Sequence, residues 1–322
     1  ILWSIFGFNE FGFLKFINFI VITIPISIIV LECLSFHEIK NLFIILLALD
    51  FVLCFFAITG IFETPRPDGR ISILGGGPIT FARWMGYGVI SLYFLPFKKT
   101  YFLRFSFIIL FLIYCLVSGS RGPFTILLLI FMLYFFLNFR KIFLRFSILF
   151  SIIIAVFLFS NLSKDISELG RTDRVFLNVA KKGGSNQSTQ TRYELAQRSL
   201  NLIKTYPFGI GAGNWQEIAN RYDSTHLMAH EYPHNLIFEI MNEYGVFVGI
   251  LFLLFVLHVS YSAYAKMKNN THVNSLYPFL FYLWIFLLLN AMLSGSLDDS
   301  RLLFITSCSI LVNSPLTLKE DE

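Results

Sequence analysis

Residues 41–62 read NLFIILLALDFVLCFFAITGIF, and Asp50 is the single charged side chain in this stretch. An α-helix needs about 20 mostly apolar residues to cross the ~30 Å hydrocarbon core of a bilayer. The stretch meets this requirement and therefore predicts a membrane-spanning helix.

Stretches of the same kind recur along the chain. Of the 322 residues, 56% are apolar and only 14% are charged, whereas roughly one quarter of a soluble domain is charged. This composition, together with apolar runs that recur at lengths near the ~20 residues of a membrane-crossing helix, predicts an all-α, polytopic transmembrane helix bundle of about nine spans. The predicted spans are 11–34, 41–62, 79–97, 101–117, 124–137, 142–162, 235–264, 276–293 and 302–312.

One long polar segment interrupts the apolar stretches. We expect residues 1–162 to form an N-terminal transmembrane bundle, 163–233 a large helical loop outside the bilayer, and 234–322 the C-terminal transmembrane helices. The chain begins with Ile1 and no Met, and residues 1–8 resemble the end of an earlier span. We therefore expect further spans before it.

Basic residues indicate how the chain is oriented. Alternate short connections between the predicted spans are enriched in Lys and Arg, and by the positive-inside rule they face the cytoplasm. They contain Lys40, Lys98, Lys99, Arg104, Arg140, Lys141, Arg145, Lys266 and Lys268. Residues 63–78, 118–123, 163–233 and 295–301 then share the opposite, periplasmic face. The basic residues are scattered between spans and form no patch, so the net charge of +5 does not indicate nucleic-acid binding.

The first polar feature of this face is the turn from Ser118 to Pro123, which contains Ser120 and Arg121. An arginine at a membrane edge is costly to desolvate and usually has a partner. It could extend to lipid phosphates, or it could bind a ligand. The neighbouring Gly122 and Pro123 favour a fixed backbone and hence a ligand.

The second feature is a predicted helix that starts at Thr191. Thr191 and Glu194 have the spacing of a capping box, which would place Arg192 in the first turn, where backbone N–H groups favour an anion. We interpret residues 181–190 as a flexible linker before this helix. The helix is expected to end at Tyr206-Pro207, followed by a glycine-rich turn at 209–213, which either only reverses the chain or binds a ligand.

The third feature is a group of histidines followed by a polar stripe. Asn235, Glu239 and Glu243 are spaced by one helical turn, so they would lie on one face of a span. Ionisable residues inside a membrane are candidates for function, and a buried hydrogen-bond network is the alternative for the two glutamates. Gly245 and Gly249 indicate helix packing. The histidines are His226, His230 and His234.

Residues 230–234 also match the H-E-x-x-H pattern of zinc proteases. Such a site needs both histidines on one continuous helix. Pro233 disfavours that helix, because proline inside a helix costs about 3 kcal/mol. Pro233 fits better in the first turn of the next helix.

Taken together, these motifs resemble the O-antigen ligase and O-antigen polymerase superfamily. The motifs are Ser120-Arg121-Gly122, Arg192 in a long outer loop, Pro207-Phe208-Gly209-Ile210-Gly211, His234-Asn235 and Glu243-Tyr244-Gly245. The resemblance implies a multi-pass protein of the bacterial inner membrane that acts in lipopolysaccharide or other polysaccharide biosynthesis. It would be a metal-independent, inverting glycosyltransferase without a cofactor, which moves a glycan from undecaprenyl diphosphate to the lipid A core or to a lipid-linked glycan.

The resemblance also implies roles for particular residues. Arg121 and Arg192 match the essential arginines of the family, and His234 matches its essential histidine. The arginines would stabilise the leaving diphosphate, and His234 would act as general base or orient the acceptor. We expect these three side chains to converge. Substrate-binding roles are expected for Ser120, Arg70, Arg83, Asn235 and Glu239.

Two other classes of protein remain as alternatives. A transporter or flippase for a lipid-linked or charged substrate would be marked by inverted repeats or paired broken helices, and the sequence contains neither. A membrane-embedded zinc protease is the more remote alternative. Asp298-Asp299 is the one pair of outer-face carboxylates, and we interpret it as a cap for the last span rather than as a metal site. Sugar identity, ligase versus polymerase activity and oligomeric state are not predicted by the sequence.

Overall fold

The computed structural model describes residues 10–64, 70–97, 101–138, 185–221, 232–270 and 275–312. Over these ranges the regular structure is helical, and an isolated antiparallel bridge joins Glu63 to Ile73. The predicted all-α class is therefore confirmed. The chain divides into two compact units, one formed by residues 1–40 together with 187–322 and the other by 41–186.

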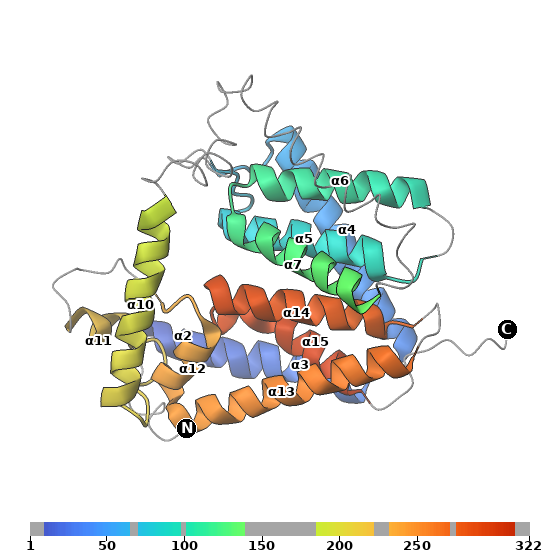
Figure 1. The fold of residues 1–322 in the computed structure, drawn as a ribbon. Coiled ribbons are helices and arrows are strands. Elements are labelled where there is room, and N and C mark those ends of the chain that lie inside the picture. Colours follow the sequence, from blue (N-terminus) through green and yellow to red (C-terminus); the bar gives the residue numbers. More distant parts are fainter. Residues whose placement is uncertain are drawn as a thin grey trace. The chain divides into compact units, whose positions relative to one another are not determined.

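The first unit combines the beginning of the chain with its C-terminal half (Figure 1). Its N-terminal helix is continuous and contains one π-helical turn. Figure 1 shows α10 running across the direction of α13 and α14. The elements of this unit are α2 (Glu10–Asn18), η1 (Phe19–Thr23), α3 (Ile24–Glu32), α10 (Ser185–Thr205), α11 (Trp215–Arg221), α12 (Leu236–Tyr244), α13 (Val246–Asn269), α14 (Tyr277–Ser294), η4 (Asp298–Ser300) and α15 (Arg301–Leu311).

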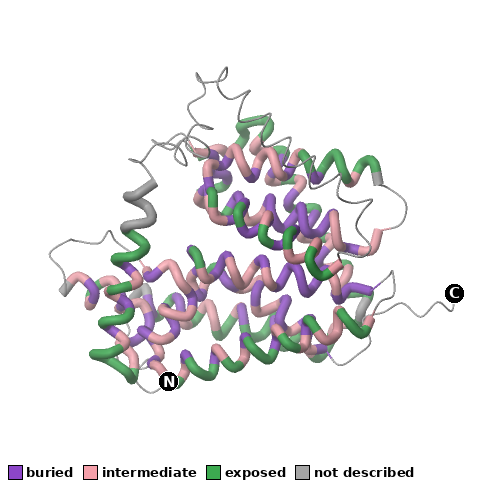
Figure 2. The backbone as a smooth tube through the Cα atoms, viewed as in Figure 1, coloured by how far each residue is buried: buried purple, intermediate pink, exposed green. Residues whose placement is uncertain are grey.

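The core of the first unit surrounds α14. This helix packs against α13 and α15, and α15 packs against α3. The indole N–H of Trp284 on α14 donates a 2.9 Å hydrogen bond to the hydroxyl of Ser307 on α15. Figure 2 shows that α14 is largely buried whereas α13 has exposed residues along its length, as expected for a helix with one side toward lipid.

The second unit contains most of α4 (Phe36–Thr59), then α5 (Pro78–Phe94), α6 (Tyr101–Val117) and α7 (Arg121–Leu137). Helix α5 packs against both α6 and α7. The phenol of Tyr87 on α5 donates to the carbonyl oxygen of Phe43 on α4 at 2.7 Å, and Phe51 of α4 contacts Phe111 of α6. Helix α5 is thus the centre of this unit.

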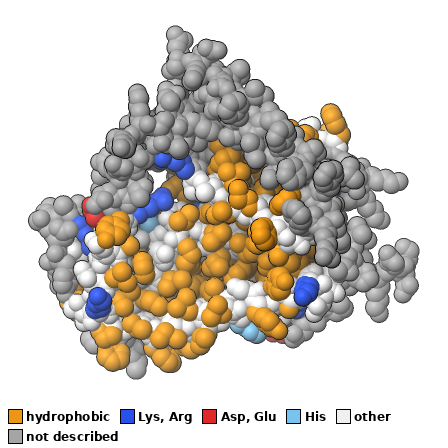
Figure 3. Space-filling model, viewed as in Figure 1, with side chains coloured by type: hydrophobic (Ala, Val, Ile, Leu, Met, Phe, Trp, Pro, Cys, Tyr) orange, Lys and Arg blue, Asp and Glu red, His pale blue; other side chains and the backbone are white. Residues whose placement is uncertain are grey.

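Four of the described helices are long and apolar enough to cross a membrane, namely Gly12–Glu32, His37–Thr59, Val246–Asn269 and Tyr277–Ser294. Phe102–Val117 and Arg121–Leu137 are shorter apolar helices. Hydrophobic side chains dominate the face drawn in Figure 3. The chain is therefore a membrane protein with several apolar helices. The count of nine spans stays a prediction, and residues 142–162 lie outside the described residues.

The predicted single span over residues 235–264 is wrong, because the helix breaks at Gly245. Gly245 has φ +94° and ψ 164°, a conformation that residues with a Cβ rarely adopt. Helix α12 ends there at Tyr244, and α13 begins at Val246. The glycine that we interpreted as part of a helix-packing motif therefore separates a short helix from the span.

The predicted helix start at Thr191 is also wrong. Helix α10 begins at Ser185 and ends at Thr205, so Thr191 and Arg192 lie inside it. The breaker in the sequence is the pair Gly183-Gly184, and the polar residues that follow contain no proline or glycine to prevent a helix. Part of the predicted linker is thus helical, and Arg192 does not have the backbone N–H groups of a first turn beside it. The predicted end before Pro207 is confirmed.

Candidate functional site

His234 lies just before α12 in the first unit. Its φ of +54° is in the left-handed region, which is uncommon for a residue other than glycine. Residues 232–235 are not helical, and Asn235 is the N-cap of α12. The predicted place of Pro233 in the first helical turn is therefore wrong, because the helix begins at Leu236. The imidazole of His234 is half-buried.

Tyr232 connects His234 to Arg192. The rings of Tyr232 and His234 have centroids 4.3 Å apart and are tilted by 50°. The Tyr232 phenol donates a 3.1 Å hydrogen bond to the carbonyl oxygen of Ser294 at the end of α14. A negative charge on Tyr232 would raise the pKa of the Arg192 guanidinium of α10, so the two side chains lie within electrostatic range of each other. Two of the three predicted catalytic side chains thus lie in the neighbourhood of the same tyrosine within one unit.

Both polar atoms of the Asn235 side-chain amide make hydrogen bonds within the protein. Its amide oxygen accepts from the backbone N–H groups of Ile237 at 3.0 Å and Phe238 at 3.1 Å. Its amide nitrogen donates to the carbonyl oxygen of Met292 at 3.0 Å. These contacts cap α12 and attach its beginning to α14. Substrate binding by Asn235 stays a prediction.

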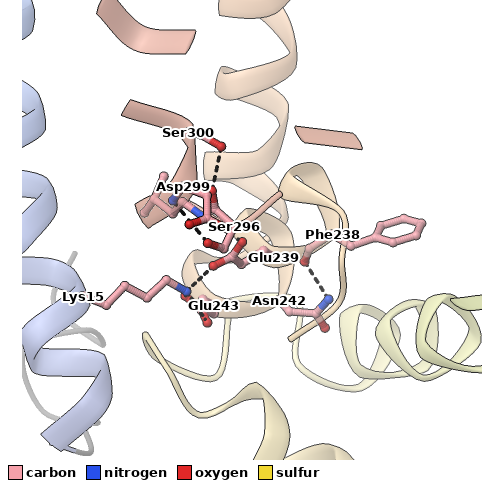
Figure 4. Close-up of polar contacts among 9 residues, drawn as sticks. Lys15, Phe238, Glu239, Asn242, Glu243, Ser296, Asp299 and Ser300 are labelled. Atoms are coloured by element: carbon pink, nitrogen blue, oxygen red, sulfur yellow. Dashed lines mark hydrogen bonds and ion pairs between the residues drawn. The ribbon is translucent and has the colours of Figure 1, made fainter. Parts of the chain in front are cut away.

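Glu239 and Glu243 on α12 form a buried ion cluster with Lys15 of α2 (Figure 4). The Lys15 ammonium contacts the Glu239 carboxylate and donates to both Glu243 oxygens, at 2.8 and 2.6 Å. The second Glu239 oxygen accepts from the backbone N–H of Leu297 at 3.0 Å. The network that the sequence left as an alternative for this pair is present, and a direct role of Glu239 toward substrate stays a prediction.

Two of the motifs quoted for the family resemblance interlock. The N–H of Ile210 donates to the carbonyl oxygen of Asn242 at 2.8 Å, and the N–H of Val246 donates to that of Pro207 at 2.8 Å. A Cβ at Gly209 or at Gly245 would come within 3.0 Å of the backbone of the other segment. This observation supports the structural interpretation of the glycine-rich turn, because its backbone fastens α10 to the end of α12.

In the second unit, the turn between α6 and α7 contacts Arg70. Gly119 has φ +73°, and a Cβ there would lie 3.3 Å from Cγ and 3.7 Å from Nε of Arg70. Ser120 is the N-cap residue of α7, buried to 6% exposure, and Arg121 is the exposed first residue of α7. The structure thus brings Arg70 beside Gly119, in the turn that leads to Ser120 and Arg121.

Arg83 belongs to the same end of this unit. It lies in the second turn of α5, and the carbonyl oxygen of the preceding Ala82 accepts a 3.6 Å hydrogen bond from the Cys115 thiol, near the end of α6. Cys115 lies three residues before Ser118, at which the α6–α7 turn begins. The predicted basic residues of the second unit therefore occur around one turn.

The acidic pair lies immediately before the last helix. Asp298 and Asp299 belong to the short 3₁₀ helix η4, and Ser300 is the N-cap of α15. Negative charges immediately before a helix interact favourably with the positive N-terminal end of its dipole. Burial raises the pKa of Asp298, and the positive charges of Lys15 and Arg301 counteract this effect. Among the described residues, no three His, Cys, Asp or Glu side chains are grouped as metal ligands.

Residues 226, 230 and 231 of the histidine-rich stretch lie outside the described residues. The non-helical backbone at 232–235 nevertheless places His234 before a helix rather than on one. A zinc protease site would need His234 on a helix, so the backbone counts against that alternative.

Sequence reasoning missed Lys15 and Tyr232. Lys15 lies inside the predicted span 11–34, and the rule that ionisable residues in spans are functional candidates would have identified it. Tyr232 was considered only as part of the protease-like pattern. Its position between His234 and Arg192 depends on tertiary structure, and no local signal in the sequence indicates it.

The apolar helices and the polar side chains gathered at their ends define a class, the polytopic α-helical membrane proteins. Within that class, the family model described as O-Antigen ligase matches residues 105–253, a range that contains Arg121, Arg192 and His234. The predicted resemblance is thereby confirmed for residues 105–253, which are similar to the O-antigen ligase family. The family indicates an enzyme that transfers glycans. No curated protein and no solved structure matched the chain.

Proposed function

We propose that the protein is a glycosyltransferase of the bacterial inner membrane that moves a glycan from undecaprenyl diphosphate to an acceptor sugar on the periplasmic face. The observation that carries the proposal is the arrangement of Arg192, Tyr232 and His234 in one unit. The imidazole, which suits a hydroxyl, contacts Tyr232, and the arginine, which suits a diphosphate, lies within electrostatic range of the same side chain. All three residues belong to the range that matches the family model.

The arginines act on the leaving group. The acceptor oxygen attacks the anomeric carbon while the bond from that carbon to the diphosphate oxygen breaks, and negative charge grows on the diphosphate. Guanidinium groups bind phosphate oxygens in a bidentate manner and keep their charge at all relevant pH values. Arg192 and Arg121 supply this stabilisation in the proposal, so no metal ion is required. Arg70, which lies beside Gly119 in the turn before Arg121, and Ser120, the N-cap residue of α7, would hold the donor together with Arg83.

His234 acts on the acceptor. A sugar hydroxyl is a poor nucleophile, and a neutral imidazole can accept its proton as the new bond forms. The Tyr232 ring, which lies against the imidazole at a tilt of 50°, limits the orientations of the imidazole. Attack opposite the diphosphate inverts the anomeric centre. Asn235 stays a candidate for an acceptor contact, whereas the Glu239 carboxylate is assigned to the buried cluster with Lys15.

Purified variants in liposomes, supplied with a lipid-diphosphate-linked glycan and an acceptor, test the proposal. His234→Ala should lower kcat by about 100-fold or more, because it removes the general base. Arg192→Lys and Arg121→Lys should not restore the loss caused by alanine, since lysine cannot form the bidentate contact. Lys204→Ala is the control, because Lys204 is an exposed cation in the last turn of the same α10. Full transfer by His234→Ala and both arginine variants would refute the proposal, whereas transfer that stops on adding EDTA would refute its metal independence.

A deletion strain separates the two possible acceptors. Lipid A cores that carry no polysaccharide at all in the deletion strain would identify a ligase, since the ligase attaches the finished polysaccharide to the core. Single repeats on the core would identify a polymerase. The readout is the size distribution of surface polysaccharide on a gel.

A further inference from the structure

The buried ion cluster in the first unit contains one cation and two carboxylates. Lys15, Glu239 and Glu243 are exposed by only 4%, 0% and 3%. Figure 4 shows the Lys15 side chain extending from α2 with its ammonium at the two carboxylates of α12. Removing one member of such a cluster leaves a buried charge without its counter-charge, which is far more damaging than replacing all members together.

The cluster joins segments that are distant in sequence. Lys15 comes from the N-terminal helix, the glutamates come from α12, and the Leu297 N–H that donates to Glu239 comes from the connection between α14 and α15. Helix α12 has only 9 residues and is separated from α13 by the glycine break. A helix this short has little stability of its own, so its position depends on these tertiary contacts.

The same helix carries the proposed general base. Asn235 caps α12 through the N–H groups of Ile237 and Phe238, and the residue immediately before the cap is His234 at φ +54°. An uncommon backbone conformation persists only where the surrounding contacts impose it. A displacement of α12 would therefore change the direction of the imidazole and its contact with the Tyr232 ring.

We infer that Lys15 is a positioning residue, whose ammonium holds α12 through Glu239 and Glu243 and thereby fixes His234 against Tyr232. The inference rests on the proposed function, because it assigns His234 a task for which direction matters. Lys15 acts through α12 and touches neither His234 nor the reacting atoms in this scheme. Small misplacements of catalytic groups can cost about 100-fold in rate.

The kinetic test compares three variants in the liposome assay. Lys15→Met should lower kcat by about 10-fold to 100-fold with the donor KM within about threefold, since binding arginines are retained. Lys15→Arg should recover most of kcat. Lys266→Met is the matched control, because the Lys266 ammonium donates to the carbonyl oxygens of Ile310 and Val312 at the end of α15. It should lower the melting temperature and keep kcat. Unchanged kcat in Lys15→Met would overturn the inference.

A neutral cluster distinguishes positioning from direct action. The triple variant Lys15→Met, Glu239→Gln and Glu243→Gln removes all three charges together and should regain much of the kcat that Lys15→Met loses. Failure of a folded triple variant to regain kcat, with a raised acceptor KM, would overturn the inference, because a glutamate would then contact substrate.

Hydrogen exchange provides a readout that needs no donor. Lys15→Met should increase exchange at the backbone amides of Ile237 and Phe238, which the Asn235 cap protects, while α14 stays protected. Unchanged exchange at these amides would overturn the inference. A wild-type protein that transfers no glycan would refute the proposed function instead, and the exchange experiment would still decide whether Lys15 holds α12.

Discussion

At the scale of single residues, Tyr232 is where the proposed chemistry is most sensitive to small changes. Its ring contacts the imidazole of His234 at a tilt of 50°, and its hydroxyl donates to the carbonyl oxygen of Ser294. Tyr232→Phe keeps the ring and loses one hydrogen bond, which contributes about 1 kcal/mol, so kcat should fall by less than about tenfold. Tyr232→Ala removes the surface against which the imidazole lies and should lower kcat by about 100-fold. The liposome transfer assay measures both, and equal activity of the two variants would contradict an orienting role for the ring.

Gly245 is the residue on which the local backbone depends most. Its φ is +94°, and a Cβ would lie 2.8 Å from backbone atoms of Phe208. Gly245→Ala should therefore lower the free energy of unfolding by about 2–3 kcal/mol through strain and overlap. Gly77→Ala is the control, because Gly77 has φ −65° and open space where the added methyl group would lie. Melting of the purified protein in detergent measures both, and equal melting temperatures would contradict the interlocked arrangement.

At the scale of elements, the close approach of α5 and α6 depends on a small residue. A Cβ at Gly88 would lie 2.7 Å from the ring of Phe111, and small residues permit such approach between membrane helices. Gly88→Ala should destabilise the protein by about 1–3 kcal/mol through overpacking.

The double variant provides the control for this packing. Phe111→Leu makes room for the added methyl group, so Gly88→Ala should cost less in that background than in the wild type, and the two effects should not add. If the change in melting temperature of the double variant equalled the sum of the changes in the two single variants, the contact between Gly88 and Phe111 would be contradicted.

The long apolar helices could be predicted because their signal is local. The stretch 41–62 lies largely within α4, and 101–117 coincides with α6, since length and composition alone determine whether a segment suits a bilayer. The break at Gly245 could not be predicted from spacing. The break exists because backbone atoms of Pro207 and Phe208 lie where a side chain at residue 245 would be. This is a contact between segments distant in sequence.

The candidate site was predictable residue by residue but not in its connections. Arg192 and His234 were recognised from motifs, whereas their common neighbour Tyr232 was not. The glutamates were recognised as a polar stripe, but their counter-charge is Lys15, 224 and 228 residues earlier in the chain. A single sequence contains no signal for a pairing at such a separation.

At the scale of the whole molecule, α13 relates the candidate site to the two sides of the membrane. Its 24 residues extend about 36 Å at 1.5 Å per residue, enough to cross a bilayer. Lys266 and Lys268 are in its last turn, and basic residues favour the cytoplasmic side. The N–H of its first residue, Val246, donates a hydrogen bond to the carbonyl oxygen of Pro207, in the turn that follows α10. The positive-inside rule therefore predicts that α10 and α12 lie on the periplasmic side.

Cysteine labelling in intact cells tests this assignment. In a background without Cys33, Cys54, Cys115 and Cys308, a cysteine replaces either Tyr193 on α10, which is 58% exposed, or Lys268. A membrane-impermeant maleimide should label Tyr193→Cys in intact cells, whereas Lys268→Cys should react only after permeabilisation, because hydrocarbon separates the two ends of α13. The opposite pattern would place Arg192 in the cytoplasm. The proposed transfer on the periplasmic face would then be excluded, because Arg192 and His234 belong to the same unit as α13.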